Sequence, residues 1–279
     1  MCALALAGVM TTGSGCSGAG AEGGSGGPAV ARGGPAGDPA AVVRRAAEEL
    51  AGAGSAETRT SMETAAGGTR VTIRGEGAYD FRRQFGRFKV VLPKDAAGAE
   101  GRRPITELLA PGTLYMKDRG AGVPEGKWVR IDTTALEDGN LVTGGVTDPT
   151  ASAELLRGAG KVTYVGRTEL AGVAVRHYRG TADIGRAART ASPSSRGALA
   201  AAARGFSTDA VPFDVYLDDE GLLRKVRHRF SFAAGGRTVA VMSTMLLYGF
   251  GAPVPVGLPP EEDIYTGRVQ QGPSGPEAP

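Results

Sequence analysis

Apolar and polar side chains alternate along residues 71–81, and this period of two restricts the segment to a strand with one buried face. Val71, Ile73 and Tyr79 lie on one face together with two glycines, whereas Thr72 and Arg74 lie on the other. The same apolar face continues through Phe88, Val90 and Leu92. The pattern therefore predicts at least two neighbouring strands over one core.

More segments of strand composition follow, separated by short, turn-like connections. We expect strands at residues 57–64, 105–110, 113–117, 127–132, 161–169, 173–183, 211–217, 222–232 and 238–248. The sequence Asp218-Asp219-Glu220-Gly221 is typical of a hairpin turn. Short connections favour an antiparallel meander, because parallel pairs need long crossovers.

Helical signals occur at a few places only. Asp38-Pro39 and Asp148-Pro149 each combine an N-cap with a first helical residue, ahead of helices at residues 40–50 and 148–156. The alanine-rich stretch 184–204 also reads as helical, with a break at Ser192-Pro193-Ser194-Ser195. This order of elements predicts an α+β fold in which a single curved antiparallel sheet wraps around its helices.

The N-terminal region has the layout of an exported lipoprotein. An apolar stretch at residues 3–10 ends in small residues before Cys16, and it is shorter than the roughly 20 apolar residues of a membrane span. We expect a signal peptide at 1–15, lipidation at Cys16, a disordered Gly/Ser-rich linker at 16–37, a folded domain at 38–262 and a disordered tail at 263–279. Gly13 departs from the usual lipobox residue, and the alternative is an incidental cysteine in a disordered terminus.

Charge and motifs argue against several classes of function. The net charge of +3 is too small to indicate a nucleic-acid partner, and Cys2 and Cys16 cannot form a disulfide framework or a cysteine metal site. His177 and His228 each lie inside a predicted strand, and no catalytic motif surrounds them. We therefore expect no catalytic residues, no metal and no cofactor, and hydrolase chemistry through one of the histidines is the alternative.

Two clusters of charge have simple structural explanations. The acidic sequence 218–220 could bind Ca²⁺, but a hairpin turn accounts for it. The basic run from Arg224 to Arg229 places Lys225, Arg227 and Arg229 on one outer strand face, where we expect solvation rather than an anion site.

The apolar face of the predicted sheet is large in relation to the helices that must cover it. These helices consist mainly of alanine, which fills little volume, and such a sheet either closes into an ordinary core or keeps an apolar cavity. We expect a cavity lined by Val71, Ile73, Phe88, Val90, Leu114, Met116, Phe230 and Phe232.

Two sequence segments carry a resemblance to a known family. The hairpin from Val215 to Val226 and the segment from Tyr248 to Val256, together with Cys16 and the helix at 40–50, resemble the LppX/LprG-type actinobacterial lipoproteins, relatives of the LolA/LolB lipoprotein carriers. The resemblance implies an open half-barrel sheet around helices and an apolar cavity for a lipid or an acylated molecule, without catalysis.

Together these observations predict a monomeric lipoprotein, anchored at the outer face of the cell membrane, that binds a hydrophobic ligand and carries it. The alternative is a surface-anchored interaction or sensory module with a filled core and no ligand.

Overall fold

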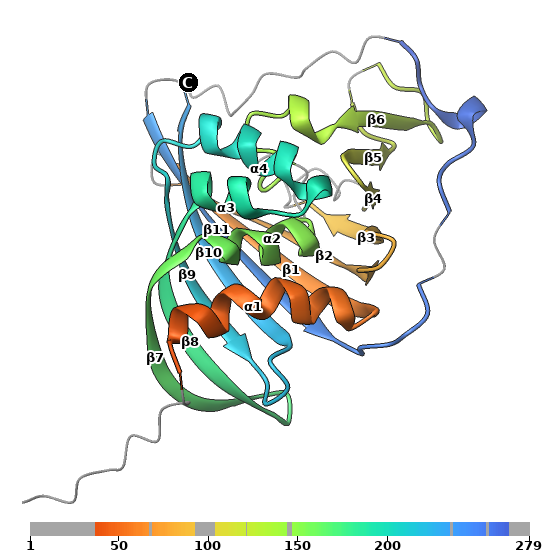
Figure 1. Ribbon diagram of the computed structural model, residues 1–279. Coiled ribbons are helices and arrows are strands. Elements are labelled where there is room, and N and C mark those ends of the chain that lie inside the picture. The colour runs from red at the N-terminus through yellow and green to blue at the C-terminus, as the bar shows by residue number, and fades with distance from the viewer. Residues whose placement is uncertain are drawn as a thin grey trace, which may run out of the picture. The chain divides into compact units, whose positions relative to one another are not determined.

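The computed structural model describes residues 37–66, 69–92, 104–120, 122–143, 147–234, 237–254 and 257–267. These residues form one antiparallel sheet of eleven strands and four α-helices (Figure 1). The prediction of a single curved antiparallel sheet with a few helices is confirmed. Residues 1–36, and with them the predicted lipidation site Cys16, lie outside the described residues.

The strands form two meanders that meet in the middle of the sheet. The first contains β1 (Ser55–Ala66), β2 (Thr69–Asp80), β3 (Phe85–Val91), β4 (Ile105–Ala110), β5 (Thr113–Lys117) and β6 (Trp128–Asp132). The second contains β7 (Ala159–Leu170), β8 (Val173–Asp183), β9 (Ala210–Leu217), β10 (Leu223–Ala234) and β11 (Arg237–Tyr248). The spatial order is β6-β5-β4-β3-β2-β1-β11-β10-β9-β8-β7, so pairing of β1 with β11 joins the two meanders.

Helices α1 and α2 begin at the caps that the sequence predicts. Asp38 caps α1 (Pro39–Gly52) and Asp148 caps α2 (Pro149–Leu155), each by accepting hydrogen bonds from backbone amides of the first turn. Asp183 caps α3 (Ile184–Thr190), and Pro193 starts α4 (Pro193–Gly205). Short 3₁₀ turns η1 (Thr133–Ala135), η2 (Leu156–Gly158) and η3 (Glu261–Asp263) complete the structure.

All four α-helices lie against the same face of the sheet, which curves around them (Figure 1). Because β6 and β7 form opposite edges, the chain between them must cross the sheet, and it carries η1, α2 and η2 across this face. Helices α3 and α4 are inserted between the neighbouring strands β8 and β9. We call the helix-covered face the concave face and the opposite one the convex face.

The main core lies between the concave face and the helices. Its packing requires a glycine at one position in β3. A Cβ atom on Gly86 would lie 2.4 Å from Tyr79 Cδ2 and 2.7 Å from Phe88 Cε2, so both rings lie over this glycine. The helices contribute mainly small side chains to the core, including Ala46, Ala187 and Ala202.

The C-terminal segment runs from the end of β11 along the outside of the sheet to β6 (Figure 1). There Ile264 pairs in parallel with Trp128, and the Tyr265 amide donates a hydrogen bond to the Trp128 carbonyl at 2.8 Å. Ile264 packs on a small convex-face cluster that contains Leu108 and Tyr115. The domain boundary predicted at residue 262 falls inside this contact. Among the described residues, no helix has the length and apolar character needed to cross a bilayer.

Candidate functional site

The side chains predicted to line a cavity share the concave face of the sheet. Those buried in the main core are Phe88, Val90, Leu114, Met116 and Phe230. Ile73 and Phe232 are partly buried against this core, whereas Val71 is 38% exposed. The structure therefore brings these side chains to one face; that they line a ligand cavity stays a prediction.

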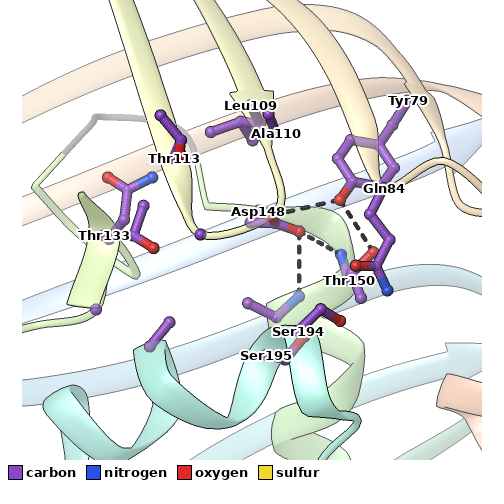
Figure 2. Close-up of a pocket in the computed structure, with 15 residues that line it drawn as sticks. Tyr79, Gln84, Leu109, Ala110, Thr113, Thr133, Asp148, Thr150, Ser194 and Ser195 are labelled. Carbon is purple, nitrogen blue, oxygen red and sulfur yellow. Dashed lines mark hydrogen bonds between the residues drawn. The ribbon is translucent and has the colours of Figure 1, made fainter. Parts of the chain in front are cut away.

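A recess opens between the concave face and helices α2 and α4 (Figure 2). Tyr79 and Leu109 contribute to it from the sheet, Thr150 from α2 and Ser195 from α4. Its volume is about 30 Å³, which is room for about one water molecule. Ligand cavities usually measure roughly 300 Å³ or more, so this recess does not hold an acyl chain as it stands.

Beside this recess, a hydrogen-bond network connects α2 and its N-cap to β2. Asp148 Oδ1 accepts bonds from the Thr150 amide at 2.7 Å and the Ala151 amide at 3.1 Å, and the Tyr79 hydroxyl donates to Asp148 Oδ2 at 3.4 Å (Figure 2). Burial raises the pKa of Asp148, whereas its backbone hydrogen bonds favour the ionised form. Burial and the Asp148 charge raise the pKa of Tyr79, which keeps the phenol protonated. This network serves the fold by joining the two layers.

Elsewhere on the concave face, several buried polar atoms have no hydrogen-bond partner among the described residues. They belong to Thr58 on β1, Glu107 on β4, Arg176 and Tyr178 on β8 and His228 on β10, and Arg227 Nε on the convex face is also without a partner. Native proteins leave few buried polar atoms unpaired, because each one loses its bonds to water and gains nothing in return. The presence of several unpartnered polar atoms on one face of the sheet therefore needs an explanation.

His228 illustrates the effect of this environment on charge. Burial lowers the pKa of His228 to about 3, so the ring is neutral at physiological pH. Its Nδ1 lies 3.3 Å from Ser152 Oγ, and its Nε2 has no partner in the described part of the chain. Among the described residues, no carboxylate forms a hydrogen bond with either ring nitrogen of His228.

Lys225, Arg227 and Arg229 of the predicted basic run lie on the convex face, where Arg229 forms an ion pair with a buried carboxylate. Asp214 on β9 accepts hydrogen bonds from His177 Nε2 at 2.8 Å and Arg179 Nε at 2.9 Å, and Arg229 forms an ion pair with it at 3.8 Å. The His177 ring stacks on Tyr216, with 4.3 Å between centroids. His177 is thus part of an ion-pair cluster that belongs to the outer surface of the sheet.

The acidic turn is organised around a single carboxylate. Asp218 Oδ1 accepts from the amides of Glu220 at 3.1 Å and Leu222 at 2.9 Å, and Asp218 Oδ2 accepts from Arg224 Nε at 2.6 Å. These bonds form the hairpin turn that the sequence predicts. No cluster of His, Cys, Asp or Glu with metal-binding geometry occurs within the described ranges.

Comparison with known proteins gives similarity at the level of structure only. No family model matches the sequence, and no curated protein matches it. The chain is similar to lipoprotein LppX of Mycobacterium tuberculosis (12% identity, 78% of this chain and 97% of that chain covered, TM-score 0.44). It is also similar to LprF of Mycobacterium bovis (14% identity, 79% of this chain and 96% of that chain covered, TM-score 0.43). A LolA superfamily protein of Nitrosomonas europaea is similar as well (12% identity, 77% of this chain and 96% of that chain covered, TM-score 0.35). Solved structures similar to this chain thus include proteins of the kind that the sequence resembles.

Sequence reasoning overlooked the most unusual residue of the concave face. Glu107 alternates with Ile105 and Leu109 on β4, so a charged residue occupies a position that the period of two assigns to the core. A charged residue at a position that the alternation assigns to the core is the sequence signal that could have identified Glu107. The partners of Asp214, in contrast, come from separate strands and leave no local pattern.

Proposed function

We propose that the protein is a cell-envelope lipoprotein that binds a hydrophobic ligand between the concave face and the helices, and carries it. The observation that supports this most directly is the set of unpartnered polar atoms of Thr58, Glu107, Tyr178 and His228 among apolar side chains. An interior that served only as a core would have apolar groups at these positions. An interior that receives the polar atoms of a ligand has a use for them.

The way the helices contact the sheet also supports the proposal. Ala46, Ala187 and Ala202 are buried at this interface, and small side chains bury less apolar area than large ones. Each of these alanines adds little to the cost of separating the two layers, whereas Leu50, Leu155 and Ile184 add more. A ligand chain would restore that burial at about 0.8 kcal/mol per CH₂ group, so ligand binding and displacement of the helices would occur together.

Lipidation at Cys16 would hold the protein at the outer face of the membrane. Replacement by Cys16→Ser should release the protein from the membrane fraction while its thermal unfolding stays unchanged, because the folded domain begins at residue 38. A Cys16→Ser protein that remains membrane-bound, with a mature N-terminus elsewhere, would show that the anchor is assigned incorrectly.

The ligand can be tested with two neighbouring residues of one strand. Val90 points into the core and is fully buried, whereas Val91 is 48% exposed on the convex face. Val90→Trp should reduce binding of a fluorescent fatty-acid analogue at least tenfold, and Val91→Trp should leave it unchanged. Organic extracts of protein purified without detergent should contain lipid by mass spectrometry. Lack of extracted lipid together with lack of binding would refute the carrier function.

A second candidate function is supported by the small volume of the recess. A filled core without ligand fits a surface-anchored interaction module whose outer face contacts another envelope protein. The convex face offers Lys225, Arg227 and Arg229 beside Tyr216 for such a contact. The same lipid measurements separate the two functions, because only the carrier holds lipid.

A further inference from the structure

Glu107 lies among apolar side chains on the concave face of the sheet. It lies directly opposite Phe88 on β3 and Met116 on β5, and Ile105 and Leu109 precede and follow it on the same face of β4. All of these neighbours are buried, and the Glu107 side chain is itself fully buried. A carboxyl group is thus placed among side chains that were predicted to line the ligand site.

The surroundings leave this carboxyl group without hydrogen bonds. Neither Oε1 nor Oε2 has a partner among the described residues. Burial raises the pKa of Glu107 to about 8, and the charge of Arg119 offsets only part of this effect. The side chain is therefore a neutral acid at physiological pH, with one O–H donor and acceptor oxygens that are all unused.

The carboxyl group lies beside the recess under α2 and α4. Leu109, the next residue on the concave face of β4, lines that recess, and two residues of a strand span about 7 Å. The Tyr79 and Thr150 hydroxyls lie at the same recess. A ligand that widens the recess towards Glu107 would meet polar groups at both ends.

We propose that Glu107 binds the polar end of the ligand, and that it selects an uncharged lipid with a hydroxyl group over a fatty-acid carboxylate. This inference rests on the proposed function. A neutral carboxyl group can accept a hydrogen bond from a hydroxyl group and donate one to an ester carbonyl or to the hydroxyl oxygen. A carboxylate ligand brings a charge into an apolar interior and cannot donate a hydrogen bond.

The test compares lipids of equal chain length that differ at the polar end. The probes are 1-monooleoylglycerol, methyl oleate and oleate, and oleate should bind the wild-type protein most weakly of the three, because its charge would enter an apolar interior. The wild-type protein should bind 1-monooleoylglycerol about tenfold more tightly than methyl oleate, the effect of one good hydrogen bond. Glu107→Leu should bind both equally, and Glu107→Gln should keep part of the preference, because an amide also donates and accepts. The matched control Glu76→Leu, on the exposed opposite face of β2, should behave like the wild type.

Infrared spectroscopy gives a readout that a purely structural role would not change. The carbonyl stretch of protonated Glu107 should shift more on binding of 1-monooleoylglycerol, whose hydroxyl group can donate to this carbonyl, than on binding of methyl oleate, which can only accept, and it should be absent from Glu107→Leu. A tenfold preference that persists in Glu107→Leu, or a stretch that ignores the hydroxyl ligand, would overturn the inference and leave the lipid-binding function intact. If the wild type and Glu107→Leu bind none of the probes, the proposed function fails as well.

Discussion

Two buried carboxyl groups on opposite faces of the sheet have opposite environments. Asp214 on the convex face is surrounded by His177, Arg179 and Arg229, whereas Glu107 on the concave face has no hydrogen-bond partner among the described residues. Burial opposes ionisation of Asp214, but the hydrogen bonds from His177 and Arg179 outweigh it and hold its pKa below the usual range. For Glu107 burial dominates and raises the pKa to about 8.

Asp214 therefore stabilises the fold, whereas the buried carboxyl group of Glu107 destabilises it. The partners of Asp214 compensate for the loss of water, so the charged form stabilises the packing of β8, β9 and β10. Glu107 loses water without compensation from the described residues. Substitutions at the two positions should therefore change stability in opposite directions.

The largest effect is expected at Asp214. Asp214→Asn keeps the shape of the side chain but removes the charge that His177 and Arg179 bind, and it should lower the free energy of unfolding by about 2–3 kcal/mol. Urea denaturation at pH 7 measures this change. The control Asp219→Asn, at an exposed ion pair with Arg167, should change stability by at most about 0.5 kcal/mol. If Asp214→Asn and Asp219→Asn lower the free energy of unfolding equally, Asp214 contributes no more to stability than an exposed carboxylate.

A smaller change of opposite sign is expected at Glu107. Glu107→Leu removes the unpartnered carboxyl group from an apolar position and should raise the free energy of unfolding by about 1–2 kcal/mol at pH 7. Glu107→Gln should bring little or no gain, because it leaves polar atoms at the same place. If Glu107→Leu lowers stability, the carboxyl group has a structural partner and is not reserved for a ligand.

The sequence predicted the fold more completely than the site, for a physical reason. The strands at 105–110, 113–117 and 173–183 agree residue for residue with β4, β5 and β8, because alternation and turn residues act locally. The helix break is a local feature too, but it is shorter than predicted, because α4 begins at Pro193 and includes Ser194 and Ser195. The burial of Glu107, in contrast, depends on register with β3 and β5, and the network of Tyr79 and Asp148 joins residues far apart in the chain.

The pH dependence of stability tests the environments of Glu107 and His228 together. Glu107 keeps its proton in the folded state up to about pH 8 and loses it near its ordinary pKa of 4.5 when unfolded, so rising pH destabilises the fold between these values. His228 has a folded pKa of about 3 and an ordinary value of 6.5, so falling pH destabilises the fold below pH 6.5. The two effects oppose each other between pH 4.5 and 6.5.

Above pH 6.5 only the Glu107 effect remains. Between pH 6.5 and 8 the wild type should lose up to about 1.4 kcal/mol per pH unit relative to Glu107→Leu. Urea denaturation of both proteins across this range measures the difference. If the free energy of unfolding depends on pH in the same way in both proteins, Glu107 ionises with an ordinary pKa in the folded state. The contrast between Glu107 and Asp214 would then be wrong.

The smallest effect is expected at a third carboxylate, Asp218 in the hairpin turn. Both of its oxygens already accept hydrogen bonds, from the Glu220 and Leu222 amides and from Arg224. A Ca²⁺ ion would have to displace these bonds, and it needs six or more oxygen ligands. Addition of Ca²⁺ or EDTA should therefore shift the melting temperature by less than about 1 °C, the scale of a change well below 1 kcal/mol. If EDTA lowers the melting temperature by several degrees and Ca²⁺ restores it, the turn is a metal site. Asp218 would then bind a ligand, as we propose for Glu107, and would differ from Asp214, whose partners are side chains of the protein.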